Sequence, residues 1–90
     1  MTTTYRRHPD LRLAALEGEG VVLHLGSRKY FTVSETGVTL LELLEQPRTL
    51  EALVSGLVER YEVDPARAER SVRDFLDRCR AAGLLQEAGS

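Results

Sequence analysis

The hydrophobic positions follow a two-residue period near the start of the chain and a helical period after residue 34. Two runs rich in β-branched and aromatic residues, 21–25 and 28–33, lie on either side of the pair Gly26-Ser27. This arrangement predicts an antiparallel β-hairpin, because glycine supplies the positive φ that a type II′ turn needs. A weaker alternation over residues 11–16 predicts a third short strand, which the turn-forming residues 17–20 separate from the hairpin.

Three helices are predicted from the helical period and from residues that cap helix starts. Ser34 predicts the start of a first helix that runs to about Gln46, and Thr49 predicts the start of a second. Asp64 followed by Pro65 predicts the start of a third, since proline fits the first helical position. The apolar stripes of the second and third helices, which we expect in the core, consist of Leu50, Leu53, Val54, Leu57, Val58, Tyr61, Ala68, Val72, Phe75, Leu76 and Cys79.

The order of these elements predicts the fold class. Strands that precede helices favour an α+β domain, in which a three-stranded antiparallel sheet is followed by three helices packed on one face. The arrangement is similar to a winged helix-turn-helix. Gly83 is expected just beyond the third helix, where a left-handed residue commonly ends a helix. We expect a flexible N-terminal arm over 1–10, one domain over 11–85 and a frayed tail over 86–90.

Composition and charge narrow the class of protein. Hydrophobic residues make up 42% and charged residues 29%, as in ordinary globular proteins. The net charge of −2 argues against a nucleic-acid partner, because phosphate neutralisation by a basic face supplies most of such affinity. The sequence contains neither an apolar run of about 20 residues nor a secretory signal, so we expect no membrane association and a cytoplasmic location.

No group of residues suggests catalysis or metal binding. His8 and His24 have no cysteine or carboxylate at metal-ligand spacing, so we expect solvated or edge-facing histidines. Cys79 lies on the apolar stripe of the third helix and is expected to fill the core with little reactivity. Two carboxylates are four residues from an arginine and predict helix ion pairs, Glu69–Arg73 and Asp74–Arg78. We therefore expect no enzyme activity, no catalytic residue, no metal and no cofactor.

The hairpin and the first helix carry a family resemblance. Residues 29–37 (KYFTVSETG), followed by 40–44 (LLELL), resemble the PqqD-like family. Members of this family are recognition elements of ribosomally made, post-translationally modified peptides. The pattern continues in order through residues 47–53 (PRTLEAL), 61–64 (YEVD), 75–76 (FL) and 82–85 (AGLL).

The resemblance implies that the domain binds the leader region of a precursor peptide. In the family the leader adds as an extra strand beside the third strand, in a groove that the third helix closes. Strand side chains alternate, so Phe31 and Val33 are expected to face the helices, while Tyr30 and Thr32 share the other face. The residues expected to contact the peptide are Lys29, Tyr30, Phe31, Thr32, Val33, Ser71, Asp74, Phe75 and Arg78.

Two branches of the family remain open at this stage. One is the standalone leader-binding subunit of lasso-peptide systems, which works with a leader-cleaving cysteine protease and an ATP-dependent cyclase. The other is a peptide chaperone for pyrroloquinoline quinone synthesis, which works beside a radical enzyme. The short hairpin over 23–31 is more similar to the lasso branch. Outside the family, a winged-helix DNA-binding regulator and an oligomerisation module that pairs through its open sheet edge are the alternative functions.

Overall fold

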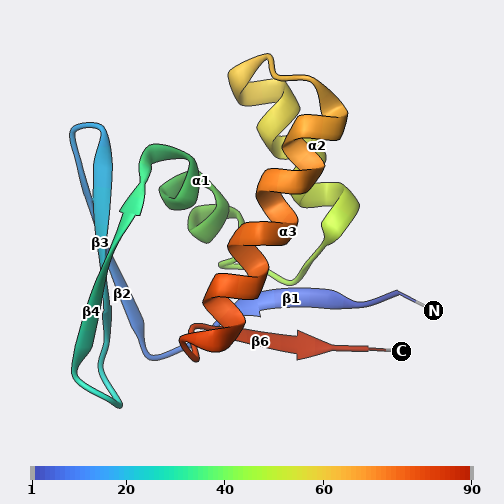
Figure 1. The fold of residues 1–90 in the computed structure, drawn as a ribbon. Coiled ribbons are helices and arrows are strands. Elements are labelled where there is room, and N and C mark those ends of the chain that lie inside the picture. Colours follow the sequence, from blue (N-terminus) through green and yellow to red (C-terminus); the bar gives the residue numbers. More distant parts are fainter. Residues whose placement is uncertain (1, 90) are drawn as a thin grey trace.

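Two small antiparallel sheets and three helices make up the computed structural model, which describes residues 2–89 (Figure 1). The first sheet has the order β2-β3-β4, and the second has the order β5-β1-β6. The strands are β1 (Thr4–Arg7), β2 (Leu11–Leu16), β3 (Glu19–His24), β4 (Lys29–Ser34), β5 (Arg48–Thr49) and β6 (Leu85–Ala88). The helices are α1 (Glu35–Leu43), α2 (Leu50–Tyr61) and α3 (Pro65–Ala81). The predicted α+β class and the predicted three-stranded sheet are confirmed.

The hairpin of β3 and β4 is confirmed, but its turn is not the predicted one. His24 pairs with Lys29, so the connecting loop spans residues 25–28. Arg28, and not Gly26, has the left-handed backbone, with φ of 60°. Its backbone N–H donates to the carbonyl oxygen of His24 at 2.8 Å. This hydrogen bond offsets part of the cost of about 1–2 kcal/mol that a left-handed conformation imposes on a residue with a Cβ atom.

The predicted helix starts are confirmed by three side-chain caps. Each cap satisfies a backbone N–H that has no partner within its own helix. The capping hydrogen bonds are Gly37 N–H to Ser34 Oγ at 3.2 Å, Ala52 N–H to Thr49 Oγ1 at 3.1 Å and Arg67 N–H to Asp64 Oδ2 at 3.2 Å. The first of these caps fixes the direction in which the chain leaves β4 and enters α1.

Helices α1 and α3 end through different interactions. Helix α1 ends at Leu43, three residues before the predicted Gln46. The guanidinium of Arg48 donates to the terminal carbonyl of Leu43 at 3.0 Å, and Pro47 disfavours helical backbone in the residue before it. Helix α3 is followed by Gly83 with φ of 73°, as predicted. The N–H of Gly83 donates to the carbonyl oxygen of Arg80, and the N–H of Leu84 donates to the carbonyl oxygen of Cys79. These two hydrogen bonds form a Schellman motif.

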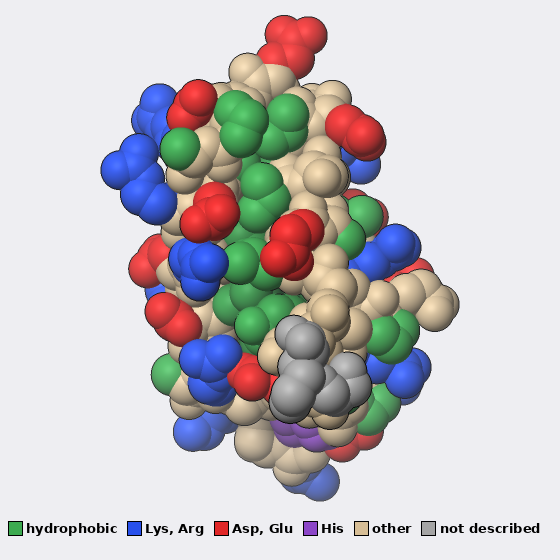
Figure 2. Space-filling model, turned by 90° about the vertical axis from the view of Figure 1, so that its right-hand side faces the viewer, with side chains coloured by type: hydrophobic (Ala, Val, Ile, Leu, Met, Phe, Trp, Pro, Cys, Tyr) green, Lys and Arg blue, Asp and Glu red, His purple; other side chains and the backbone are tan. Residues whose placement is uncertain are grey.

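The core lies between the β2-β3-β4 sheet and the three helices, which all lie on one side of that sheet (Figure 1). Val22 is fully buried at the centre of the sheet. The helices contribute Leu40, Leu41, Leu53, Leu57, Ala68, Val72, Phe75, Leu76 and Cys79. The predicted buried stripe of α3 is confirmed in full. Figure 2 shows the helical side of the molecule, where a strip of hydrophobic side chains lies between charged side chains of both signs. Among the described helices, none is both long and apolar enough to cross a membrane.

The second sheet joins the two ends of the described chain. Strand β1 pairs with β6 from Thr4 opposite Ala88 to Arg7 opposite Leu85. The expectation of a flexible arm over 1–10 and a frayed tail over 86–90 is therefore wrong for these strands; residues 1 and 90 lie outside the described residues. Tyr5 and Leu85 pack against the core, and this packing together with the backbone ladder holds both ends.

Candidate functional site

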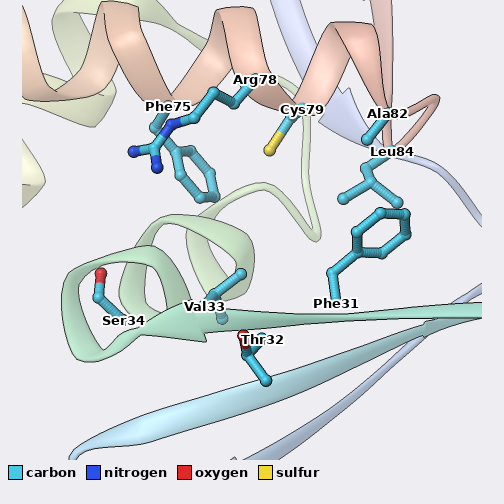
Figure 3. Close-up of a pocket in the computed structure, with 9 residues that line it drawn as sticks. All are labelled: Phe31, Thr32, Val33, Ser34, Phe75, Arg78, Cys79, Ala82 and Leu84. Carbon is cyan, nitrogen blue, oxygen red and sulfur yellow. The ribbon is translucent and has the colours of Figure 1, made fainter.

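A groove lies between the outer edge of β4 and helix α3 (Figure 3). Within residues 2–89, β4 pairs only with β3, so its outer edge presents backbone N–H and C=O groups to no other strand. Such an edge is a template for a further strand. The groove is lined by Phe31, Thr32, Val33, Ser34, Phe75, Arg78, Cys79, Ala82 and Leu84.

The floor of the groove is apolar and comes from two elements. Phe31 and Val33 point from β4 toward α3, and Phe75 and Cys79 point back from the helix (Figure 3). Phe31 and Val33 are half-buried and pack against the core, whereas Tyr30 is 72% exposed. The predicted alternation of side chains along β4 is therefore confirmed.

Leu84 reaches the groove because of the way in which α3 ends. The Schellman motif turns the chain back on the helix, so that Leu84 is buried and lies opposite Phe31 (Figure 3). Ala82, the last residue before Gly83, adds a small apolar side chain at the same end. The apolar floor therefore continues beyond the last turn of the helix.

One charged side chain lines the groove. The guanidinium of Arg78 makes an ion pair with Asp74 at 3.1 Å, and both side chains are largely exposed at the rim. Burial raises the pKa of the Cys79 thiol to about 11, and the neighbouring charge of Arg78 opposes this shift. Because a neutral buried thiol is a poor nucleophile, Cys79 contributes apolar surface to the groove.

The size of the groove limits what it holds. Its volume is about 200 Å³. Sites for drug-sized ligands usually enclose about 300–1,000 Å³, so this groove suits a few side chains of an extended chain better than a compact molecule. No group of three or more His, Cys, Asp or Glu side chains in the described part of the chain is arranged to hold a metal ion.

The groove brings together five of the residues that the sequence predicts. Phe31, Thr32, Val33, Phe75 and Arg78 line it, although the side chain of Thr32 points away from α3 (Figure 3). The remaining predicted residues are placed differently: Lys29 and Tyr30 begin β4 outside the lining, Asp74 stands at the rim, and Ser71 lines another cavity beside α2. The structure thus groups the centre of β4 with the second half of α3.

Four lining residues were not expected from the sequence. Cys79 and Ala82 follow Phe75 by four and seven residues, which places all three on one face of a helix. The same spacing along α3 is the sequence signal that finds them, since a residue that fills the core can also line a groove. Ser34 caps α1 and also lines the groove, and the position of Leu84 depends on the Schellman motif.

The two histidines form a pair outside the lining of the groove. The rings of His8 and His24 have centroids 4.6 Å apart and both residues are half-buried, so the expectation of solvated or edge-facing histidines did not include this ring contact. Each Nδ1 accepts a backbone N–H, from Asp10 at 3.0 Å and from Ser27 at 3.2 Å. The pair ties the β1–β2 connection to the hairpin loop.

The fold and the groove define a small α+β module in which a helix lies along the free edge of an antiparallel sheet. The sequence pattern of the family described as coenzyme PQQ synthesis protein D (PqqD) matches residues 19–85. The chain belongs to this PqqD family, as its sequence resemblance predicts. No curated protein sequence matches the chain.

Solved structures share the fold over nearly the whole chain. TbiB1, solved in complex with the TbiA(beta) leader peptide, is 31% identical, with a TM-score of 0.78 over 90% of this chain and 94% of that chain. Lasso peptide synthetase B1, complexed with the leader peptide, is 21% identical, with a TM-score of 0.75 over 91% of this chain and 96% of that chain. The PqqD truncation of Methylobacterium extorquens PqqCD, described as a stand-alone RiPP recognition element, is 21% identical. Its TM-score is 0.76 over 92% of this chain and 88% of that chain.

Proposed function

We propose that this chain binds the leader segment of a ribosomally made precursor peptide and presents it to the enzymes that process the precursor. The leader adds as a strand to the outer edge of β4, and α3 closes the groove over it. The observation that carries this proposal is the free edge of β4 beside an apolar groove whose floor comes from Phe31, Val33 and Phe75. In this role the chain has no reaction of its own and works in the cytoplasm.

Backbone hydrogen bonds and side-chain pockets have separate roles in this mechanism. Each hydrogen bond to β4 contributes a net of about 0.5–1.5 kcal/mol, whatever side chains the leader carries. Selectivity then depends on alternate leader side chains, which enter the apolar groove between β4 and α3. Arg78 at the rim offers the guanidinium donors with which a carboxylate of the leader can pair.

Lasso-peptide biosynthesis is the system that the comparisons favour. The 31% identity with TbiB1 extends over nearly all of both chains, and TbiB1 was solved with a leader peptide. We therefore propose a leader-cleaving cysteine protease and an ATP-dependent cyclase as the partner enzymes. The family description keeps a second candidate open, a peptide chaperone that serves pyrroloquinoline quinone synthesis beside a radical enzyme.

A DNA-binding role receives less support from the surface of α3. Arg73, Arg78 and Arg80 each make an ion pair with a nearby carboxylate. These carboxylates reduce the positive potential that phosphate binding requires. A steep salt dependence of binding to duplex DNA would favour this role over peptide binding.

The test is a titration of fluorescein-labelled synthetic leader peptides, followed by fluorescence anisotropy, with and without EDTA. We expect saturable binding of a lasso-precursor leader that EDTA leaves unchanged, and weaker binding of the precursor peptide for pyrroloquinoline quinone synthesis. The reverse order of affinity would assign the chain to the quinone branch. Loss of binding in EDTA, or no binding of either peptide, would contradict the proposed metal-free leader binding.

A further inference from the structure

The face of the β2-β3-β4 sheet that points away from the helices carries large apolar side chains. Leu23 lies opposite Tyr30 in β4 and Arg12 in β2, so the three side chains form one row across the sheet. The next row contains Ala14, Val21 and Thr32, and the one after it contains Leu16, Glu19 and Ser34. We call this surface, defined by these nine residues, the outer sheet face.

No described element covers the outer sheet face. All three helices lie on the opposite side of the sheet, as Figure 1 shows. Tyr30 is 72% exposed, Leu16 is 56% exposed and Leu23 is 37% exposed. The fully buried Val22 separates Val21 from Leu23 in the sequence, which confirms that these two side chains point outward. Leu23 and Tyr30 are neighbours in one row, so their exposed apolar surface is available for contact with another molecule.

Charge divides the outer sheet face into two ends. At the hairpin-loop end, Arg12 belongs to the face and Arg28 borders it. Both are exposed and neither makes an ion pair within residues 2–89, although the guanidinium of Arg12 donates to the carbonyl oxygens of Pro9 and Leu11. At the opposite end, Glu19 belongs to the face and Glu17 borders it in the turn after β2, and both carboxylates are exposed. A complementary surface therefore has apolar side chains to meet Tyr30, Leu23 and Leu16, carboxylates at one end and basic groups at the other, and opposite charges fix its orientation.

The area of this face argues against a second copy of the chain as its occupant. Three strands of six residues cover about 14 Å by about 20 Å, or roughly 300 Å². A stable protein–protein interface buries about 800 Å² on each partner, so this face alone supports only transient contact. A strand added to β4 would widen the same face by about 4.8 Å and add its own outward side chains.

Because the face is continuous with the leader site, and resting on the proposed function, we infer that the outer sheet face docks the protease that cleaves the leader of the bound precursor. The leader site and this face share strand β4: Phe31 and Val33 point into the groove, while Tyr30 and Thr32 belong to the outer sheet face. The enzyme therefore contacts a surface that the leader completes, and it binds the loaded module in preference to the empty one. The partner that fits has an apolar patch with carboxylates placed to meet Arg12 and Arg28.

The test uses the double variant Leu16→Thr/Leu23→Thr, which removes apolar surface outside the leader groove and keeps residues that favour strands. Leader binding is measured first by fluorescence anisotropy, and Ala52→Ser on the exposed surface of α2 serves as the control. Binding to the immobilised leader protease of the same biosynthetic system is then measured with and without the leader peptide. Circular dichroism confirms that each variant is folded.

We expect all three proteins to bind the leader equally, and the unmodified chain to bind the protease about tenfold more tightly when loaded. The double variant should lose about tenfold or more of the affinity for the protease, and Ala52→Ser should lose none. Equal protease binding by the double variant would overturn the inference, as would equal binding of loaded and empty modules. Concentration-dependent dimerisation that the double variant abolishes would assign the face to a second copy instead. If the unmodified chain does not bind the leader, the proposed function is contradicted. This result comes from the anisotropy measurement alone, so it is distinct from a failure of protease docking.

Discussion

Gly37 lies directly against Phe75, and this contact sets how closely α1 approaches the groove. A Cβ atom on Gly37 would stand 3.1 Å from Cε1 of Phe75 and 3.1 Å from Cβ of Val33. Both neighbours line the groove. The absence of a side chain at Gly37 therefore keeps β4, α1 and α3 at the spacing on which the shape of the groove depends.

Gly37→Ala is expected to destabilise the protein, although alanine is a better helix former than glycine. The added methyl group forces Phe75 or Val33 to move, and such overpacking costs about 1–3 kcal/mol, against a propensity gain of about 1 kcal/mol. Urea denaturation should show a lower free energy of unfolding, and anisotropy should show weaker leader binding. Gly89→Ala is the control, because nothing lies within 4 Å of an added Cβ there. A Gly37→Ala protein that is as stable as the unmodified chain would show that the groove tolerates wider spacing.

Thr32→Pro tests strand addition to β4. Proline removes one backbone N–H and fixes φ, and an edge strand tolerates it better than a central strand does. We expect the variant to stay folded by circular dichroism and to bind the leader at least about tenfold more weakly. Thr32→Ala is the matched control, since it removes the side chain and keeps the N–H, and it should bind almost normally. A folded Thr32→Pro protein with normal affinity would rule out leader pairing at this position.

Arg78→Ala and Asp74→Ala test the rim of the groove. Arg78 lines the groove, and Asp74 holds its guanidinium, so both changes should weaken leader binding severalfold. The thermal midpoint should change little, because exposed helix ion pairs contribute only about 0.3–0.5 kcal/mol. Arg73→Ala breaks an exposed pair with Glu69 that has the same spacing, outside the groove lining, and should leave binding intact. Equal affinities in all three variants would place the leader away from this side of α3.

Cys79 offers a chemical probe of the groove. Its pKa is raised from 9.0 to about 11 by burial, so its thiol should react slowly with a thiol-specific reagent at pH 8 and rapidly after unfolding. Stability linked to this group is present in full below pH 9.0 and is lost as the pH rises toward about 11, since the unfolded thiol ionises first. Cys79→Ala should lack this part of the alkaline destabilisation. Fast labelling of the folded protein would show that the thiol is accessible and ionised.

The parts of the fold that depend on local chemistry could be predicted from the sequence. Ser34, Thr49 and Asp64 cap helices through hydrogen bonds that span three residues, so the necessary information lies within a few positions. The buried stripe of α3 was predicted for the same reason, because its spacing repeats over 17 residues.

The parts that depend on distant pairing could not be predicted. Thr4 pairs with Ala88 across almost the whole length of the chain, and strands of four residues are too short to show a periodic pattern. In the groove, the alternation in β4 correctly placed Phe31 and Val33. Ser71 shares the helix of Phe75 but lines another cavity, together with Leu57 and Tyr61 of α2, and the spacing along α3 does not reveal this division.

The pairing of β1 with β6 makes the chain enter and leave the fold at one place. Thr4 and Ala88 are cross-strand partners, and Figure 1 shows the outer ends of β1 and β6 on the side of the molecule opposite the β2-β3-β4 sheet. A domain whose ends lie close together can be inserted into a loop of another protein, or circularly permuted, without distorting the fold of either protein. This architecture therefore lends itself to fusion with an enzyme through short linkers, while the edge of β4 remains open on the far side.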